Sequence, residues 1–339
     1  MNSPPRILVC RSDNLGDLLL SLPAIKSLRQ SFPEAEIALL AKKNNLKLLQ
    51  TFLEEQKIRP ISLEEKWDCE KWDAFLGLFC SGAIASKVFL KRVPVRVGQY
   101  SKFWSFALFN YGKRQKRSLA DQSEGTYSLE LVQELVTQLG GKTNKEIAMV
   151  QLPRDEKQAA LAEQALLQSG IRPESKFIVV HPGMAGSALN LSREQYAEII
   201  RKITAKVDCV VSVGPSRQDQ LIWSYLKSEF PNLKKIEGLE LSALKEVFRQ
   251  SQLVIAPSTG PLHLAHLVGV PVIGIYSPVR AHHPRRWGPW GGEQKSIVHW
   301  PQVECPGKSS CLGPSCPEFN CMEKIDWASL ILKEVDGLT

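Results

Sequence analysis

The segment RILVCRSDNLGD, residues 6–17, joins a short apolar run to a polar loop and the start of a helical pattern. Residues 6–10 have the composition of a buried strand, and residues 17–30 continue as a helix that Phe32 and Pro33 end. Further apolar runs alternate with helical patterns along the chain, at residues 36–41, 72–79, 176–180, 208–213, 253–256 and 272–276. Because runs of Val, Ile and Leu between helices indicate a parallel sheet covered on both faces, the sequence predicts an α/β protein.

The alternation of strands and helices restarts after the segment VQLPR at residues 150–154, which has the character of a linker. We therefore expect two Rossmann-like domains, residues 1–150 and 151–321, with their parallel sheets facing a central cleft. Residues 322–339 are expected to form a helix that packs back on the N-terminal domain. Such sheets bind ligands at the carboxyl ends of their strands, so the loops that follow the strands are the candidate sites.

The overall composition excludes several classes of protein. The chain has 339 residues, of which 43% are hydrophobic, so disordered and fibrous classes do not apply. Its apolar runs are short and interrupted by Gly and Pro, and no segment is predicted to span a membrane. The N-terminus meets charged residues close to its first apolar run, which indicates a buried strand rather than a signal peptide. We therefore expect a cytoplasmic protein with reduced cysteines.

Positive charge is concentrated in one stretch of the chain. The formal net charge is +8, and residues 74–120 hold nine Lys or Arg and no Asp or Glu. Aromatic residues are interleaved with these basic side chains at Phe103, Trp104, Phe106, Phe109 and Tyr111. Such a stretch attracts nucleic acid, anionic lipid or a phosphorylated glycolipid. A solvated helix face above aromatic core residues explains the same pattern, so charge alone leaves both interpretations open.

The loop at residues 11–17, RSDNLGD, follows the first strand and contains a single glycine, Gly16. A dinucleotide fingerprint needs three glycines at fixed spacing, so a nicotinamide or flavin cofactor is not predicted. The loop instead places the carboxylate of Asp17 at the end of a strand and the start of a helix. This carboxylate is either a functional group that faces the cleft or an acid favoured only by the helix dipole.

Two loops in the second half have the composition of anion sites. In residues 256–263, APSTGPLH, Pro261 lies just inside a helix start, so the N–H groups of Thr259, Gly260 and Leu262 are free to bind an anion. This order of strand, Ser-Thr-Gly-Pro and helix favours diphosphate binding over an ordinary capped helix. Residues 181–192, HPGMAGSALNLS, follow another strand. That loop either contacts a phosphate through backbone N–H groups or is a plain connection with a buried His181.

Taken together, the three loops resemble glycosyltransferase family 9, the lipopolysaccharide heptosyltransferases. The stretch NLGD at 14–17 with Pro23-Ala24 resembles the N-terminal motif of that family, and HPG at 181–183 with GSA at 186–188 resembles its second motif. The third motif is matched by STGPLHLA at 258–265, GVPV at 269–272 and YSP at 276–278. The resemblance implies a GT-B fold. It also implies a metal-independent, cofactor-free and inverting transfer of a heptose from ADP-heptose to a lipopolysaccharide inner-core acceptor.

The resemblance implies roles for individual residues. Asp17 matches the general base that removes the proton of the acceptor hydroxyl, and Arg11 matches a basic position that holds an acidic sugar of the acceptor. The backbone N–H groups of Thr259, Gly260 and Leu262 would stabilise the departing nucleoside diphosphate.

His263, on the same helix turn, is either a further donor contact or a packing residue. The sequence departs from the family pattern at two other donor positions. Many members carry a Lys after the His-Pro-Gly motif, where this chain has Ser187 in the stretch SALNL, and many carry an Asp where it has Ser258. The charge of the leaving group would then be met by other groups, for which we name Ser187, Arg193 and the cluster Arg280, Arg285 and Arg286. A non-catalytic protein of the same fold that binds a nucleotide sugar or a polyanion is therefore the alternative function.

The implied partners are a nucleotide-sugar donor, an anionic glycolipid acceptor and the cytoplasmic surface of the inner membrane, to which the protein would be peripheral. Because the resemblance assigns the N-terminal domain to the acceptor, we interpret the basic stretch as the acceptor-binding surface. The residues assigned to it are Lys113, Arg114, Lys116 and Arg117. Nucleic acid is not expected as a partner.

Four cysteines near the C-terminus, Cys305, Cys311, Cys316 and Cys321, are the one candidate metal set. They are separated by five, four and four residues, and no Cys-x-x-Cys pair occurs, so the zinc signal is weak. A structural metal, reduced thiols and a disulfide all remain open, and no metal is predicted for the reaction.

Overall fold

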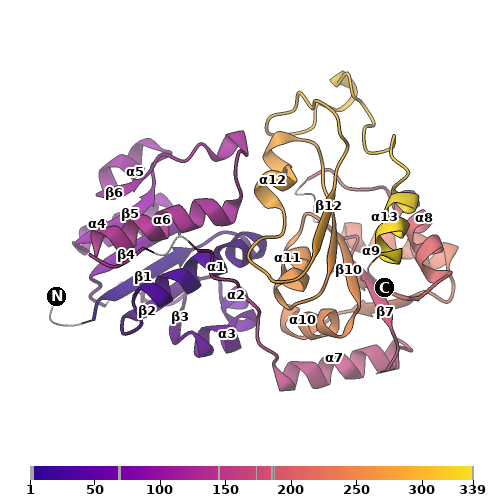
Figure 1. The fold of residues 1–339 in the computed structure, drawn as a ribbon, viewed down its shortest axis with the longest axis horizontal. Helices are drawn as coiled ribbons and strands as arrows, with labels where there is room; N and C mark the ends of the chain where they lie inside the picture. The colour runs from indigo at the N-terminus through magenta and orange to yellow at the C-terminus, as the bar shows by residue number, and fades with distance from the viewer. Residues whose placement is uncertain are drawn as a thin grey trace. The chain divides into compact units, whose positions relative to one another are not determined.

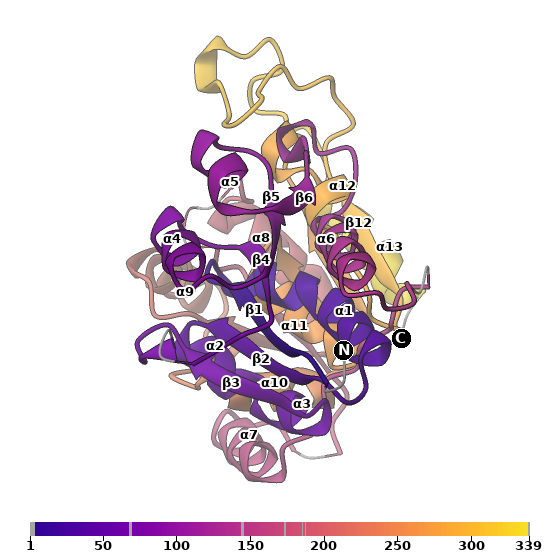
Figure 2. The same cartoon turned by 90° about the vertical axis from the view of Figure 1, so that its left-hand side faces the viewer.

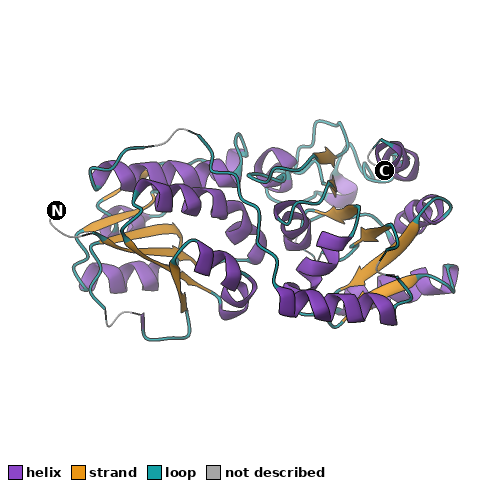
Figure 3. Ribbon diagram, turned by 60° about the horizontal axis from the view of Figure 1, so that its bottom comes forward, coloured by secondary structure: helices purple, strands orange, loops and turns teal. Residues whose placement is uncertain are grey.

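The computed structural model describes residues 4–67, 70–143, 146–172, 174–184, 186 and 188–337. The chain divides into two compact units, Met1–Arg117 with Asp121–Pro153, and Arg154–Thr339 with Ser118–Ala120. Each unit is built around one parallel sheet with helices on both of its faces (Figures 1 and 3).

The first unit contains six parallel strands in the order β3-β2-β1-β4-β5-β6. The strands are β1 (Arg6–Arg11), β2 (Glu36–Ala41), β3 (Ile58–Ser62), β4 (Ala74–Phe79), β5 (Val95–Gln99) and β6 (Tyr111–Lys113). Its α-helices are α1 (Leu15–Ser31), α2 (Lys43–Leu48), α3 (Gln50–Glu55), α4 (Gly82–Leu90), α5 (Phe103–Leu108) and α6 (Glu124–Gln138), and a 3-10 turn, η2, covers Arg117–Leu119. The central strands are buried on both faces, which is why β1 is apolar without alternation.

The second unit repeats this architecture with the order β12-β11-β10-β7-β8-β9. Its strands are β7 (Phe177–Val180), β8 (Asp208–Val213), β9 (Lys234–Glu237), β10 (Leu253–Pro257), β11 (Val272–Ile275) and β12 (Ser296–His299). Its α-helices are α7 (Glu156–Gln168), α8 (Arg193–Thr204), α9 (Arg217–Glu229), α10 (Leu241–Gln250), α11 (Gly260–Leu267), α12 (Pro284–Trp287) and α13 (Trp327–Asp336). Two 3-10 turns, η3 (Arg280–His282) and η4 (Gly313–Ser315), lie in the connection between β11 and α13.

The predicted α/β class with two parallel sheets is confirmed, and the differences lie at the sheet edges. The expected strands within 6–10, 36–41, 72–79, 176–180, 208–213, 253–256 and 272–276 correspond to β1, β2, β4, β7, β8, β10 and β11. The edge strands β3, β6, β9 and β12 were not predicted. They are short and half exposed, and so lack the long apolar run that marks a central strand.

The C-terminal helix corrects the expectation that it packs back on the N-terminal domain. Helix α13 belongs to the second unit, where Trp327, Ala328, Ile331 and Val335 enter the hydrophobic core beside α8. A hydrogen bond from Lys202 Nζ to Ser329 Oγ, 2.6 Å, joins the two helices at their surface. The apolar stripe at i, i+4 and i+8, which is Trp327, Ile331 and Val335, is buried in that core. No helix in the described ranges is long and apolar enough to cross a bilayer.

Candidate functional site

The connection from β1 to α1, which carries Asp17 in the first turn of the helix, lies at the point where the strand order of the first sheet reverses. Strand β1 has β2 on one side and β4 on the other. The chain therefore leaves β1 at the point where the helices on either side of it pass to opposite faces of the sheet. The backbone N–H of Ser12 donates to the carbonyl of Phe79 at the end of β4, 3.1 Å away. Such a switch point leaves a crevice at the carboxyl edge of the sheet, which is where open parallel sheets bind ligands.

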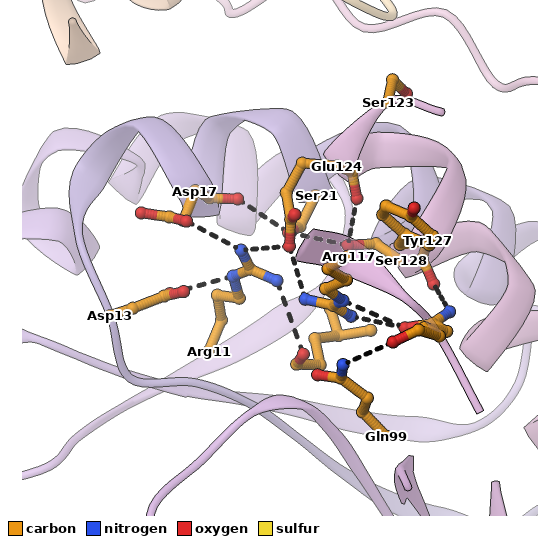
Figure 4. A network of polar contacts seen from close by, with 12 residues as sticks. Arg11, Asp13, Asp17, Ser21, Gln99, Arg117, Ser123, Glu124, Tyr127 and Ser128 are labelled. Carbon is orange, nitrogen blue, oxygen red and sulfur yellow. Dashed lines mark hydrogen bonds and ion pairs between the residues drawn. The ribbon is translucent and has the colours of Figure 1, made fainter. Parts of the chain in front are cut away.

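Arg11 is the centre of a buried ion-pair network in this crevice (Figure 4). Its side chain is fully buried. Its Nη2 lies 3.2 Å from Asp17 Oδ1 and 3.2 Å from Glu124 Oε1, and its Nε lies 2.9 Å from Asp13 Oδ1. Three carboxylates therefore surround one guanidinium. Figure 4 shows the second oxygen of Asp17 directed away from the network, and the Asp17 side chain keeps 18% of its surface exposed.

A second guanidinium closes the network from the other side of Glu124. Arg117 Nη1 donates to Glu124 Oε1, and its Nη2 donates to Gln115 Oε1 at 2.7 Å. Gln115 is held in turn by its own amide, which donates to the carbonyl of Tyr127 at 2.7 Å. Glu124 is itself fully buried at the start of α6, so a single carboxylate oxygen holds both arginines in position.

The charges of this network do not balance when every group is ionised. Two guanidiniums face three carboxylates, and burial disfavours the surplus negative charge. The pKa of Asp13 is accordingly raised to about 7, first by burial and then by the neighbouring Asp17, although Arg11 opposes the shift. Near neutral pH the network therefore takes up a proton at Asp13.

The structure corrects the expected placement of two basic residues. Arg11 is not presented to an acceptor, because its guanidinium is enclosed by carboxylates. Arg117 is buried in the same network rather than exposed in the basic stretch. Lys113, Arg114 and Lys116 are exposed as expected, and Lys113 Nζ lies 2.9 Å from Glu134 Oε2.

Asp13 and Glu124 were missed by the sequence analysis. Glu124 follows Ser123, whose hydroxyl accepts from the N–H of Thr126, so it resembles an ordinary first-turn acid of a capped helix. Its partner Arg11 is 113 residues away in the chain. No local pattern reports a contact of that separation. The only available signal was the pair of acids, Asp121 and Glu124, that follows the 47-residue stretch without acids.

The second unit has its own switch point, between β7 and β10, and two predicted loops meet there. The N–H of His181, after β7, donates to the carbonyl of Ile255 in β10 at 2.9 Å. Helix α11 begins directly after β10 with Thr259 as an extended N-cap residue and Pro261 in the first turn. No side chain caps this helix, since the Thr259 hydroxyl donates to the Pro257 carbonyl. Its first turn therefore offers backbone N–H groups for an anion.

The other predicted donor residues are placed as follows. Ser258 is half buried, and its N–H donates to the carbonyl of Ile275 at 3.2 Å, so the sheet uses that donor. Ser187 lies outside the described residues. His263 is buried, and its pKa is lowered to about 3 by burial and by His266. His263 is thus neutral near pH 7 and offers a hydrogen bond, not a positive charge, to any ligand.

The glycine of the His-Pro-Gly loop has a specific packing role. The Asp219 carboxylate closes a capping box with Ser216 at the start of α9 and reaches toward this loop. A Cβ at Gly183 would lie 2.5 Å from Asp219 Oδ1, and one at Gly214 would lie 2.4 Å from Asp219 Oδ2. Both positions exclude a side chain for that reason. Next to them His181 Nδ1 contacts Ser212 Oγ at 2.5 Å, and burial lowers the pKa of His181 to about 4.

The four C-terminal cysteines are free thiols. Among the residues that the structure describes, no group of three or more His, Cys, Asp or Glu side chains is arranged to hold a metal ion. The Cys311 sulfur accepts the N–H of Gly313 at 3.4 Å, and burial raises the pKa of the Cys321 thiol.

Comparison with known proteins identifies the family. The family model for glycosyltransferase family 9 (heptosyltransferase) matches residues 73–314. The chain belongs to this family. A protein of Haemophilus influenzae with a provisional glycosyltransferase name is 28% identical to it over 325 residues, which cover 90% of this chain and 91% of that protein.

Solved structures of glycosyltransferases share the fold of this chain. Heptosyltransferase II of E. coli aligns over 98% of both chains with a TM-score of 0.73 and 17% identity. A family 9 glycosyltransferase of Veillonella parvula aligns over 98% of both chains with a TM-score of 0.70 and 15% identity. The E. coli heptosyltransferase WaaC, solved with ADP, has a TM-score of 0.68 and 16% identity over 98% of this chain and 100% of its own. This family 9 chain is therefore an α/β glycosyltransferase of the heptosyltransferase fold.

Replacing Glu124 with Gln tests the network as a buried structure. The change leaves two buried guanidiniums with one carboxylate fewer, so E124Q should lower the free energy of unfolding by about 3–5 kcal/mol. Urea unfolding of the purified protein measures this loss. The matched control is E134Q on the same helix, which removes the partly exposed ion pair with Lys113, keeps an amide oxygen to accept from Gln138, and should cost at most about 1 kcal/mol. Equal losses in the two variants would contradict a special role for Glu124.

The raised pKa of Asp13 predicts a pH dependence of stability. Unfolded Asp13 ionises near its ordinary pKa of 3.8, whereas the folded protein keeps the proton up to about pH 7. Folded wild type therefore loses stability as pH rises from about 4 to about 7, a loss that D13N lacks. Urea unfolding across this range should show that the free energy of unfolding of D13N rises relative to that of wild type by roughly 2–4 kcal/mol. A difference that stays constant with pH would show that Asp13 titrates normally.

Proposed function

We propose that this family 9 protein transfers a heptose from ADP-heptose to an inner-core lipopolysaccharide acceptor, with inversion at the anomeric carbon and without a metal ion. The donor is supported by solved heptosyltransferases described with ADP or with an ADP-linked heptose, which are 14–16% identical to this chain. The acceptor class is supported by the solved lipopolysaccharide heptosyltransferase II and by the basic stretch of the first unit.

The observation that carries the proposal is the placement of Asp17. Its carboxylate lies at a switch point, one oxygen is held by buried Arg11, and the other is directed away from the network. A base fixed in this way accepts the proton of an acceptor hydroxyl while the hydroxyl oxygen attacks the anomeric carbon. The bond from that carbon to the diphosphate breaks in the same step, and the nucleoside diphosphate leaves with its electron pair.

The leaving diphosphate needs positive partners, which we assign to the second unit. The N–H groups of Thr259, Gly260 and Leu262 at the uncapped start of α11 supply the positive end of a helix dipole. Further charge comes from Arg280, Arg285 and Arg286, which follow β11, the neighbour of β10. These groups compensate for Ser187, which stands where many members of the family carry a lysine.

The alternative is a protein of this fold that binds a nucleotide sugar or polyanion without turnover. Its motivation is the pair of substitutions at Ser187 and Ser258. The buried network argues against this alternative, because the side chains of Arg11, Asp13 and Glu124 together hold the Asp17 carboxylate in place. A binding protein has no need for a carboxylate fixed in that position.

Replacing Asp17 with Asn removes the base and keeps the shape of the side chain. We expect D17N to lower kcat by about 10²–10⁴-fold, since general base catalysis is worth that much, while ADP still raises the melting temperature. Mass spectrometry of the product from ADP-heptose and a deacylated inner-core acceptor measures transfer.

The matched control is D155N, which removes the N-cap carboxylate of α7 in the second unit. Because Asn is as good an N-cap residue as Asp, this variant should lose at most about 0.5 kcal/mol of stability and keep its turnover. Unchanged turnover in D17N would refute the assigned base. Stabilisation of wild type by ADP, without product from any donor and acceptor pair, would favour the binding protein instead.

A triple variant tests the acceptor-binding surface. Lys113, Arg114 and Lys116 are exposed, so replacing all three with Ser should raise the KM for the acceptor and leave ADP binding unchanged. Arg117 is kept, because its loss would unfold the buried network. The control replaces three exposed lysines of the second unit, Lys157, Lys308 and Lys333, and so removes the same charge. Equal effects of the two triple variants on KM would show that only net charge matters.

A further inference from the structure

Helix α5 has an unusual distribution of side chains for a surface helix. Its sequence, FWSFAL, contains no charged residue, and it lies in the stretch without acids. The face that packs on the unit consists of Trp104, Ser105 and Leu108. The opposite face, at spacings of three and four residues, consists of Phe103, Phe106 and Ala107, all of them exposed. A helix that is apolar on its outer face marks an interaction surface.

The inner face of α5 explains why the helix stays in place without the side chain of Phe103. The Trp104 ring packs against Phe109 at a centroid distance of 6.1 Å, and it also lies against Gly82 at the start of α4. Ser105 is buried, and its hydroxyl donates to the carbonyl of Lys102 at 2.6 Å. Phe103 contributes nothing to this packing, because 95% of its surface is exposed.

Basic side chains surround the exposed aromatic face. Lys102 precedes Phe103 directly, and the guanidinium of Arg114 lies over the Phe106 ring at 5.0 Å. Lys113 and Lys116 are also exposed close to Arg114 in the chain, on and after the edge strand β6. Residues 74–120 contribute no carboxylate side chain to this surface, and the Glu134 carboxylate on α6 pairs with Lys113 at 2.9 Å.

Helix α4 extends this surface. It ends with Phe89 and Leu90, which are exposed by 43% and 75%, and Lys91 and Arg92 follow. Arg96 connects the two helices, because its guanidinium lies over the Phe89 ring and its Nε donates to the Leu108 carbonyl at 2.8 Å. Figures 1 and 2 both show α4 and α5 as neighbours at one end of the first unit.

We propose that this surface, made by α5, the end of α4 and the basic residues beside them, binds an anionic lipid bilayer, with Phe103 inserted among the headgroups. Exposed aromatic residues flanked by Lys and Arg are the composition of interfacial membrane anchors. Protein interfaces, in contrast, are depleted in lysine, so a bilayer fits the surface better than a protein partner. The inference deepens the proposed function, on which it rests, by giving the acceptor-binding unit a site for the membrane that holds a glycolipid acceptor.

Flotation of the full-length protein with lipid vesicles tests the surface directly. Wild type should float with vesicles of phosphatidylcholine mixed with phosphatidylglycerol and stay behind with phosphatidylcholine alone. F103S should lower the partition to anionic vesicles about tenfold, because one aromatic side chain no longer leaves water. Salt should weaken the binding of both proteins, because it screens the attraction between the exposed basic residues and the anionic headgroups.

The matched control is L167S, which removes an exposed apolar side chain on α7 of the second unit. It should leave vesicle binding unchanged, and all variants should keep the melting temperature of wild type within about 2 °C, as is usual for exposed positions. Equal flotation of F103S and wild type would overturn the proposal. So would a wild-type dimer that F103S converts to a monomer in sedimentation, with no flotation of either, because the surface would then bind a second copy.

Transfer assays separate this inference from the proposed function. F103S should transfer to a deacylated, soluble acceptor at the wild-type rate and lose about tenfold on acceptor embedded in anionic vesicles. If wild type floats but transfers to neither acceptor, the function fails and the membrane surface stands. If wild type transfers to both acceptors but does not float, the function stands and the membrane surface is refuted.

Discussion

The buried guanidinium of Arg11 is the constraint on which the candidate site depends. A charge with no exposed surface is tolerated only when carboxylates surround it, and Asp13, Asp17 and Glu124 do so. Through Arg11 the loop after β1 is joined to the start of α6, and through Glu124 it is joined to Arg117. The position of the proposed base Asp17 is therefore set by a network that spans the first unit, not by its own loop.

The two units use one architecture for opposite electrostatic purposes. In each sheet the strand order reverses beside the first strand, so the loops that leave the switch point carry the candidate groups. The first unit collects carboxylates there around buried arginines. The second unit has an uncapped helix start and histidines kept neutral by burial, at His181 and His263. Under the proposed function, the first unit would supply the group that removes the proton and the second unit the groups that bind the diphosphate.

Several elements of the site could be predicted because they depend on local sequence. The carboxylate of Asp17 at a strand end and Pro261 inside the first turn of α11 follow from strand and helix periods and from the fixed φ of proline. Arg117 shows where such reasoning ends. Its neighbours Lys113, Arg114 and Lys116 are exposed. No feature of this basic segment of the sequence distinguishes Arg117, whose side chain pairs with the buried Glu124.

By itself the sequence determined the α/β class, the two parallel sheets, the loops in which we propose the chemistry occurs and the membership of glycosyltransferase family 9. Each of these depends on periodicity or on a short motif, which neighbouring residues specify. Only the tertiary structure decided that Arg11 and Arg117 are enclosed by Glu124, that α13 completes the second core, and that α5 turns aromatic residues outward. The ion pair between Arg11 and Glu124, 113 residues apart in the chain, depends on how the strands are ordered in the sheet. Which face of a short helix is buried depends on the residues that pack beneath the helix.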